Sequence, residues 1–161
     1  MKKDIFIDNN IASRFKNPAD PEYIKLIKWL LSYQKVNEDE EDIINAHLVV
    51  SNKLLSEYHL SNYNVKGNQN IITIISILTK QGRLSKISNQ AIKDFKQEYY
   101  TKKNVKKLTC NQEDREHIPI ILLSDRKYAL AIDDAFVSNI LSFPGFHALA
   151  CKRPEEMPYH L

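Results

Sequence analysis

Four short apolar runs, separated by stretches with helical periodicity, constrain the fold of this chain more than any other feature. The runs are Lys3–Ile7, Ala46–Val50, Tyr128–Ile132 and Phe146–Ala150. Runs so short suit buried strands, and the 3.6-residue spacing of apolar side chains between them suits amphipathic helices. Parallel strands joined by helices are covered on both faces. We therefore expect an α/β fold, a three-layer α/β/α sandwich around a mostly parallel sheet of four or five strands.

Capping residues indicate where several of the helices begin and end. Asp20 can cap a helix that has Pro21 at its first position, and Ser51 and Ser88 precede two further helical patterns. The apolar helix over residues 71–80 is expected to stop at Gly82. These signals mark the boundaries of the expected helices. The sequence contains no internal repeat and no low-complexity segment.

The remaining elements are predicted from weaker patterns. A short helix is expected over Ile11–Phe15, ending near Asn17, and the acidic stretch Glu38–Asp42 is interpreted as a surface turn. Lys106–Leu108 suggests a short edge strand. A helix over residues 111–123 should be kinked by Pro119, which lacks an amide hydrogen.

Length and composition exclude several classes of protein. A chain of 161 residues suits one domain, residues 1–161, with an ordinary hydrophobic fraction of 43%. Its three glycines cannot form a GxGxxG dinucleotide fingerprint, and no GxxxxGK[ST] loop, HExxH pair or GxSxG elbow is present. Cys110 and Cys151 lack CxxC spacing, so we expect free thiols. Without a signal peptide or a long apolar run, we expect a cytoplasmic protein that does not enter the membrane.

Four acidic residues are expected at one end of the sheet. Ligands of open parallel sheets bind beyond the carboxyl ends of the strands, near the point where strand order reverses. Asp8 directly follows the first strand and Asp133 follows the third. Glu57 lies on the helix after the second strand, and Asp114 lies in the first turn of a helix that leads to the Asp133 strand.

Each acid also has an ordinary structural explanation. Asp8 can form an Asx turn, and Glu57 can pair with Lys53 one helical turn earlier. Asp114 stands three residues after the capping Asn111, and Asp133 can cap the helix that follows it. For any one acid the ordinary explanation is the better one. Four acids at the same end of the sheet favour a shared role.

Converging carboxylates need a counter-charge. Two such groups about 4 Å apart repel by about 4 kcal/mol at an effective dielectric constant near 20. The cluster must therefore hold protons at raised pKa values or bind cations. Ligand sets made only of oxygen select Mg²⁺ or Mn²⁺, and these ions support the hydrolysis of phosphodiesters.

The middle of the chain is basic although the net charge is only +3. Such a region suits either a nucleic-acid backbone or an ordinary solvated helix face. We take it as the candidate surface for nucleic acid. Its candidate contacts are Lys93, Lys96, Lys102, Lys103, Lys106 and Lys107.

Several segments together resemble the PIN-domain family of ribonucleases. The resemblance covers nearly the whole chain in order. It rests on Ile5–Asn10, Leu48–Ser51, Leu54–Tyr58, Asp114–Ile118, Ala129–Phe136 and Phe143–Phe146. It implies a metal-dependent endoribonuclease that uses Mg²⁺ or Mn²⁺, often the toxin of a bacterial toxin–antitoxin pair. It also implies that Asp8, Glu57, Asp114 and Asp133 are ligands.

The chain departs from the family pattern at two places near the fourth acid. Ala131 stands where many members have a serine or threonine hydroxyl, and Asp134 beside Asp133 leaves the identity of that ligand open. The partners that remain open are RNA, an antitoxin protein and a second copy of the chain. The alternative function is a catalytically reduced PIN-like module that binds RNA or protein. A receiver-like domain is disfavoured because no lysine follows a late strand in a suitable place.

Overall fold

The computed structural model describes residues 1–16, 18–63 and 70–161, and these form a three-layer α/β/α sandwich. Its centre is a sheet of five parallel strands in the order β3-β2-β1-β4-β5. The strands are β1 (Lys3–Ile7), β2 (Ala46–Val50), β3 (Leu84–Lys86), β4 (Tyr128–Leu130) and β5 (Leu149–Cys151). The predicted fold class is therefore confirmed.

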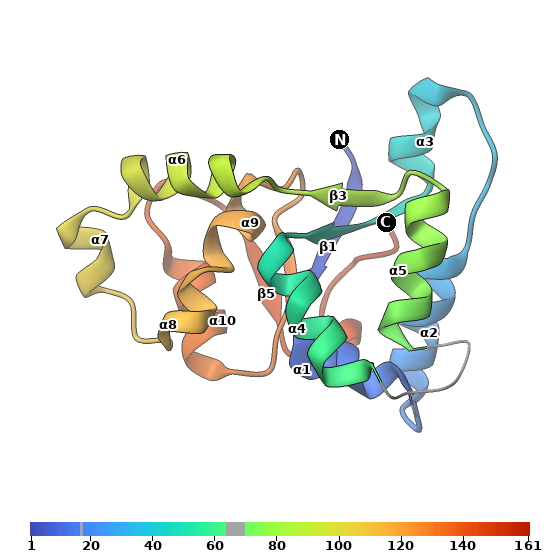
Figure 1. Ribbon diagram of the computed structural model, residues 1–161, viewed down its shortest axis with the longest axis horizontal. Coiled ribbons are helices and arrows are strands. Elements are labelled where there is room, and N and C mark those ends of the chain that lie inside the picture. The colour runs from blue at the N-terminus through green and yellow to red at the C-terminus, as the bar shows by residue number, and fades with distance from the viewer. Residues whose placement is uncertain (17, 64–69) are drawn as a thin grey trace.

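Helices cover both faces of the sheet. In chain order, the helices before β3 are α1 (Asn9–Ala12), the 3-10 helix η1 (Ser13–Lys16), α2 (Pro21–Leu31), α3 (Glu38–Ile44), α4 (Asn52–Asn62) and α5 (Ile71–Lys80). Those after β3 are α6 (Asn89–Tyr99), α7 (Lys102–Lys106), α8 (Gln112–Arg115), α9 (Ile118–Leu123), α10 (Asp134–Ser142) and the 3-10 helix η2 (Pro154–Glu156). Helices α2, α3 and α5 lie on one side of the sheet, and α6 to α10 lie on the other (Figure 1).

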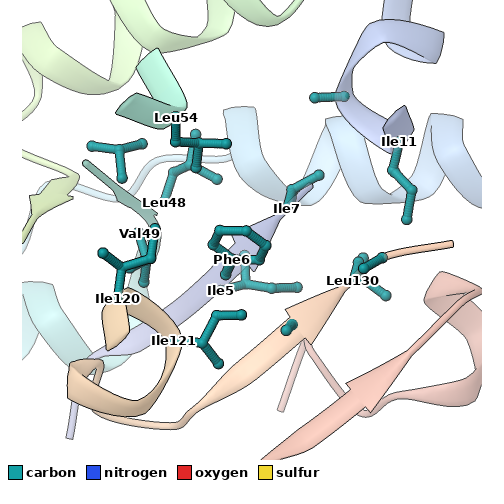
Figure 2. Packing of buried hydrophobic residues seen from close by; sticks show 14 of the residues in the cluster. Ile5, Phe6, Ile7, Ile11, Leu48, Val49, Leu54, Ile120, Ile121 and Leu130 are labelled. Carbon is teal, nitrogen blue, oxygen red and sulfur yellow. The ribbon is translucent and has the colours of Figure 1, made fainter. Parts of the chain in front are cut away.

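The core is built around the two central strands. All residues of β2 are buried, and so are Asp4 to Ile7 of β1. Figure 2 shows Phe6 of β1 among side chains from β2, β4 and α9, including Leu48, Ile121 and Leu130. Successive side chains of a strand point to opposite faces, so both helical layers pack on β1 and β2.

Most of the predicted helix caps are confirmed. Asp20 Oδ1 accepts a hydrogen bond from the Glu22 amide at 2.9 Å. Ser51 Oγ accepts one from Leu54 and Ser88 Oγ one from Ala91, both at 3.1 Å. Gly82 follows α5 with φ of +67°, a conformation that glycine adopts without steric cost.

Two predicted elements were wrong, and one strand was missed. The acidic stretch over residues 38–42 is not a turn but most of helix α3, whose first turn holds four acids that favour a helix N-terminus. The edge strand predicted at residues 106–108 is the end of α7 and the turn after it. The fifth strand is instead β3, which hydrogen-bonds to β2.

Smaller expectations were met in part. The helix expected over residues 111–123 is divided into α8 and α9, with Pro119 in the first turn of α9. The short helix after Asp8 is divided between α1 and η1, and its expected end at Asn17 lies outside the described residues. Cys110 and Cys151 are free and buried, as predicted. No helix in the described residues is both long and apolar enough to cross a membrane.

Candidate functional site

The strand order places two of the candidate acids on either side of the topological switch point. Strand β1 is followed by β2 on one side and by β4 on the other, so the order reverses between β1 and β4. Asp8 directly follows β1, and its backbone amide donates a hydrogen bond to the Leu130 carbonyl of β4 at 2.9 Å. Asp133 lies just beyond the end of β4. Crevices for ligands form at this point in open α/β sheets.

Helix α4 is held against the end of β1, and this brings Glu57 toward Asp8. The buried Tyr58 hydroxyl donates a hydrogen bond to the carbonyl of Ile7, the residue before Asp8. Asn9 Nδ2 donates a second hydrogen bond to Ser61 Oγ at 2.7 Å. Because Glu57 precedes Tyr58 on the helix, these contacts bring this part of α4 close to the switch point.

A second set of contacts positions Asp114. The Asn139 side chain of α10 accepts hydrogen bonds from the amides of Thr109 and Cys110, each at 2.9 Å. Asn111 Oδ1 then caps α8 through the Asp114 amide at 2.8 Å. The segment that carries Asp114 is thereby tied to the helix that begins at Asp133.

The buried position of Asp8 makes its charge costly. Only 6% of Asp8 is exposed, and burial is the main reason that its pKa rises from 3.8 to about 6. The imidazole of His117 opposes this rise, whereas the carboxylates of Asp114 and Glu57 add to it. Asp8 forms no salt bridge within the described part of the chain.

Asp114 lies in a similar environment closer to solvent. Burial raises its pKa, His117 opposes the rise, and Asp133 and Glu57 raise it further. Asp114 is therefore close enough to both acids to feel their charge. Asp8, Glu57 and Asp114 form a mutually repelling group, with Asp133 at its exposed rim beside Asp114. We call these four residues the acid cluster.

His117 is the residue of this site that the sequence interpretation left out. Its ring is fully buried, and Nε2 lies 2.6 Å from Oε2 and 3.0 Å from Oε1 of Glu57. The ring packs against Phe6, with a centroid distance of 5.6 Å, and against Phe136, at 6.5 Å. His117 follows Asp114 by three residues, one helical turn, and that spacing was the signal that could have identified it.

The ordinary explanations of the acids can now be compared with their contacts. The Asp8 side chain does not cap α1, and Lys53 pairs with Glu113 at 2.9 Å rather than with Glu57. Asp133 does cap α10, because its Oδ1 accepts a hydrogen bond from the Phe136 amide at 2.8 Å. The ordinary explanation therefore fails for Glu57 and is confirmed for Asp133, whereas the Asp8 carboxylate forms a local hydrogen bond with the Asn9 backbone without capping α1.

Asp134 lies apart from the acid cluster. Its side chain is 85% exposed and forms a salt bridge with Lys152, next to the end of β5. Asp133, in contrast, affects the pKa of Asp114. Of the two neighbouring acids, Asp133 is therefore the one that belongs to the cluster.

The donor chemistry of the cluster suits a hard divalent cation, whereas the present side-chain positions do not form a closed set of ligands. Asp8 and Asp114 offer carboxylate oxygens that no lysine or arginine neutralises among the described residues. Both oxygens of Glu57 face His117. Within residues 1–16, 18–63 and 70–161, no three acidic, histidine or cysteine side chains lie close enough together to hold one ion.

The candidate lysines divide into two groups. Lys93 and Lys96 of α6 line a pocket beside α4, and Lys96 pairs with Glu116. The second group is exposed on α7 and the residue after it, at the outer end of that side of the molecule (Figure 1): Lys102, Lys103, Lys106 and Lys107.

Comparisons with protein-family models, with curated proteins and with solved structures found no match to this chain.

Proposed function

We propose that this chain is a metal-dependent endoribonuclease that hydrolyses RNA phosphodiester bonds in the manner of PIN domains. One observation carries the proposal. Asp8, Glu57 and Asp114 come from three separate parts of the chain, and their charges influence one another near the switch point of a parallel sheet. The deepest of them, Asp8, is buried without a salt bridge in the described residues. A buried carboxylate without a salt bridge is costly, and a functional site is a common reason for keeping one.

The residues of the acid cluster would then have different roles. Asp8 and Asp114 would supply the oxygen donors to Mg²⁺ or Mn²⁺, with Asp133 adding its uncapped oxygen from the rim. Glu57, held by His117, would accept a hydrogen bond from the attacking water or contact the bound ion. The divalent cation, when bound, lowers the pKa of water and offsets the charge of the phosphate.

The surroundings of the cluster support a nucleic-acid ligand. Lys93 and Lys96 offer positive charge in a pocket beside α4, the helix that carries Glu57, and RNA carries one phosphate for each nucleotide. The proposal includes the cytoplasm as the place of action. An antitoxin protein and a second copy of the chain are the protein partners to be tested.

A matched pair of variants tests the proposal. Asp8→Asn removes the charge of the buried acid, whereas Asp134→Asn makes the same change at the exposed acid that pairs with Lys152. Cleavage of a labelled single-stranded RNA with Mn²⁺ should fall about 100-fold or more in Asp8→Asn, because loss of residues that only support a metal site already costs 10- to 100-fold. Asp134→Asn should cleave like the wild-type protein. Equal cleavage by the wild-type and Asp8→Asn proteins would refute the proposal.

The second candidate function is a PIN-like module that binds RNA or protein without cleaving. Two observations favour it: Ala131 provides no hydroxyl before Asp133, and the described side chains do not form a closed set of three ligands. Calorimetric titration with Mn²⁺ separates the two candidates. A catalytic site binds the ion through Asp8, whereas a non-catalytic module shows no Asp8-dependent binding.

A further inference from the structure

A pocket of about 270 Å³ opens between the first turn of α4 and one flank of α6. These helices follow β2 and β3, which are neighbours in the sheet, so the pocket lies at the same carboxyl edge as Asp8. Its polar lining combines three lysines with residues from both helix starts. The lining includes Ser51, Lys53, Asn89, Lys93, Lys96 and Glu116.

The pocket lysines have positive charge to offer an anion. Lys53 pairs with Glu113 at 2.9 Å, and Lys96 pairs with Glu116. Lys93 is exposed and forms no salt bridge with any residue that the structure describes. Ion pairs this open to solvent are weak, so a phosphate oxygen can replace either glutamate at small cost.

The two helix starts add to this charge. Helices α4 and α6 each have 11 residues, and Ser51 and Ser88 cap them. The N-terminus of such a helix carries partial positive charge. Ser51 and Asn89, at the N-termini of the two helices, line the pocket together with the three lysines, so helix charge and side-chain charge favour the same kind of ligand.

Helix α4 links the pocket to the acid cluster, because it carries both Lys53 and Glu57. Lys53 and Glu57 are four residues apart on α4, a rise of about 6 Å, and the charge of Glu57 raises the pKa of Lys53. Glu113, the partner of Lys53, is next to Asp114 in the chain. An anion in the pocket would therefore stand about one helical turn from the cluster.

We propose that this pocket, with Lys53, Lys93 and Lys96, binds a phosphate of the RNA strand next to the phosphodiester at the acid cluster. The assignment of the ligand as RNA rests on the proposed function, whereas the assignment of a phosphate group rests on the residues that line the pocket. The strand then runs from the switch point along the carboxyl ends of β2 and β3. The lysines of α7 lie beyond this path and do not line the pocket.

The test measures RNA binding without turnover. A labelled single-stranded RNA is titrated with the full chain in EDTA at several salt concentrations, and binding is followed by fluorescence anisotropy. Lys93→Gln and Lys53→Gln should each weaken binding about threefold to tenfold and reduce the slope of log affinity against log salt by about 1, as expected for one lost phosphate contact. Lys28→Gln is the matched control, because Lys28 is also exposed and lies on α2 across the sheet.

Three outcomes would overturn the subsite. The first is that Lys103→Gln on α7 weakens RNA binding as much as Lys93→Gln, which would indicate diffuse electrostatic attraction rather than binding in the pocket. Lys93→Gln could behave like Lys28→Gln. A nucleoside monophosphate could bind as tightly as the RNA with the same dependence on Lys93, which assigns the pocket to a free phosphate compound. A separate result would refute the proposed nuclease function: equal cleavage of RNA by the Asp8→Asn and wild-type proteins in Mn²⁺.

Discussion

Nε2 of His117 lies within 3.0 Å of both carboxylate oxygens of Glu57, so a buried imidazole joins the start of α9 to the middle of α4. The phenyl rings of Phe6 and Phe136 pack against the imidazole and leave it no exposed surface. His117 thus links the hydrophobic core to the acid cluster. A change at this histidine should affect both stability and the position of Glu57.

We expect His117→Ala to destabilise the fold by about 2–4 kcal/mol, because it leaves a cavity beside Phe6 and removes the hydrogen-bond partner of a half-buried carboxylate. Urea denaturation measures the loss. His59→Ala is the control, because His59 is exposed on the same helix α4 and its loss should change stability by no more than about 0.5 kcal/mol. Similar midpoints for the two variants would show that the Glu57 contact contributes little.

The raised pKa of Asp8 predicts a specific pH dependence of stability in EDTA. Below pH 3.8 Asp8 is protonated in both the unfolded and the folded chain, so its burial costs nothing. Between pH 3.8 and about 6 the unfolded chain loses the proton first, and stability falls as the pH rises. Above this window the cost reaches about 3 kcal/mol at most.

Asp8→Asn should remove this cost, because its side chain stays neutral. The stability of the variant relative to wild type should increase from pH 4 to about 6 and then remain constant. Urea denaturation at each pH gives the difference. A difference that does not change with pH would mean that Asp8 has an ordinary pKa in the folded protein.

Mn²⁺ should bind to the acid cluster and stabilise the folded chain. Calorimetry should show weaker binding, by about tenfold or more, in Asp8→Asn and Asp114→Asn. Asp134→Asn should bind like wild type, since that acid faces Lys152. The midpoint of thermal unfolding should rise with Mn²⁺ concentration in wild type, because a ligand that binds only the folded state stabilises it. Identical binding by all four proteins would place the ion elsewhere.

Arg83 predicts a large effect away from the acid cluster. Its Nη1 donates hydrogen bonds to the Leu30 carbonyl at 2.7 Å and to the Ala46 carbonyl at 3.1 Å, and only 2% of the residue is exposed. Arg83→Ala leaves these carbonyls without that donor and opens a cavity, so we expect a loss of about 3–5 kcal/mol. Lys80→Ala, at an exposed position on α5, is the control. Equal urea midpoints would contradict the expected role.

The central part of the fold could be predicted from sequence because its signals are local. Strands β1 and β2 are continuous apolar runs, and Asp20, Ser51 and Ser88 cap helices as expected. Strand β3 was missed because its three residues are half-buried or exposed and show no apolar pattern. Its place at the edge is set by pairing with β2, a contact that no local pattern predicts.

Two errors had local signals that were overlooked. Thr101 Oγ1 accepts a hydrogen bond from the Asn104 amide at 3.1 Å, so residues 102–106 begin with a helix cap rather than a strand. Four acids after Asn37 favour a helix start for the same electrostatic reason that acids favour any helix N-terminus.

The acid cluster was predicted in part. Asp8 and Asp133 follow from strand ends, and their neighbours Glu57 and Asp114 also lie where expected. The choice between Asp133 and Asp134 could not be made from sequence, because either residue can cap the following helix. The structure separates them through Lys152, a residue from a distant strand end. The contact between His117 and Glu57 likewise joins residues that are 60 positions apart.

The central position of β1 has a consequence for synthesis of the protein. Residues 3–5 pair with residues 46–48, but residues 6 and 7 pair with residues 129 and 130. As the chain leaves the ribosome, one edge of β1 can be covered once β2 has emerged, while its other edge stays open until residues 129 and 130 have been translated. Open strand edges invite pairing with other chains. The growing chain must therefore keep this edge of β1 from pairing with other chains until β4 has emerged.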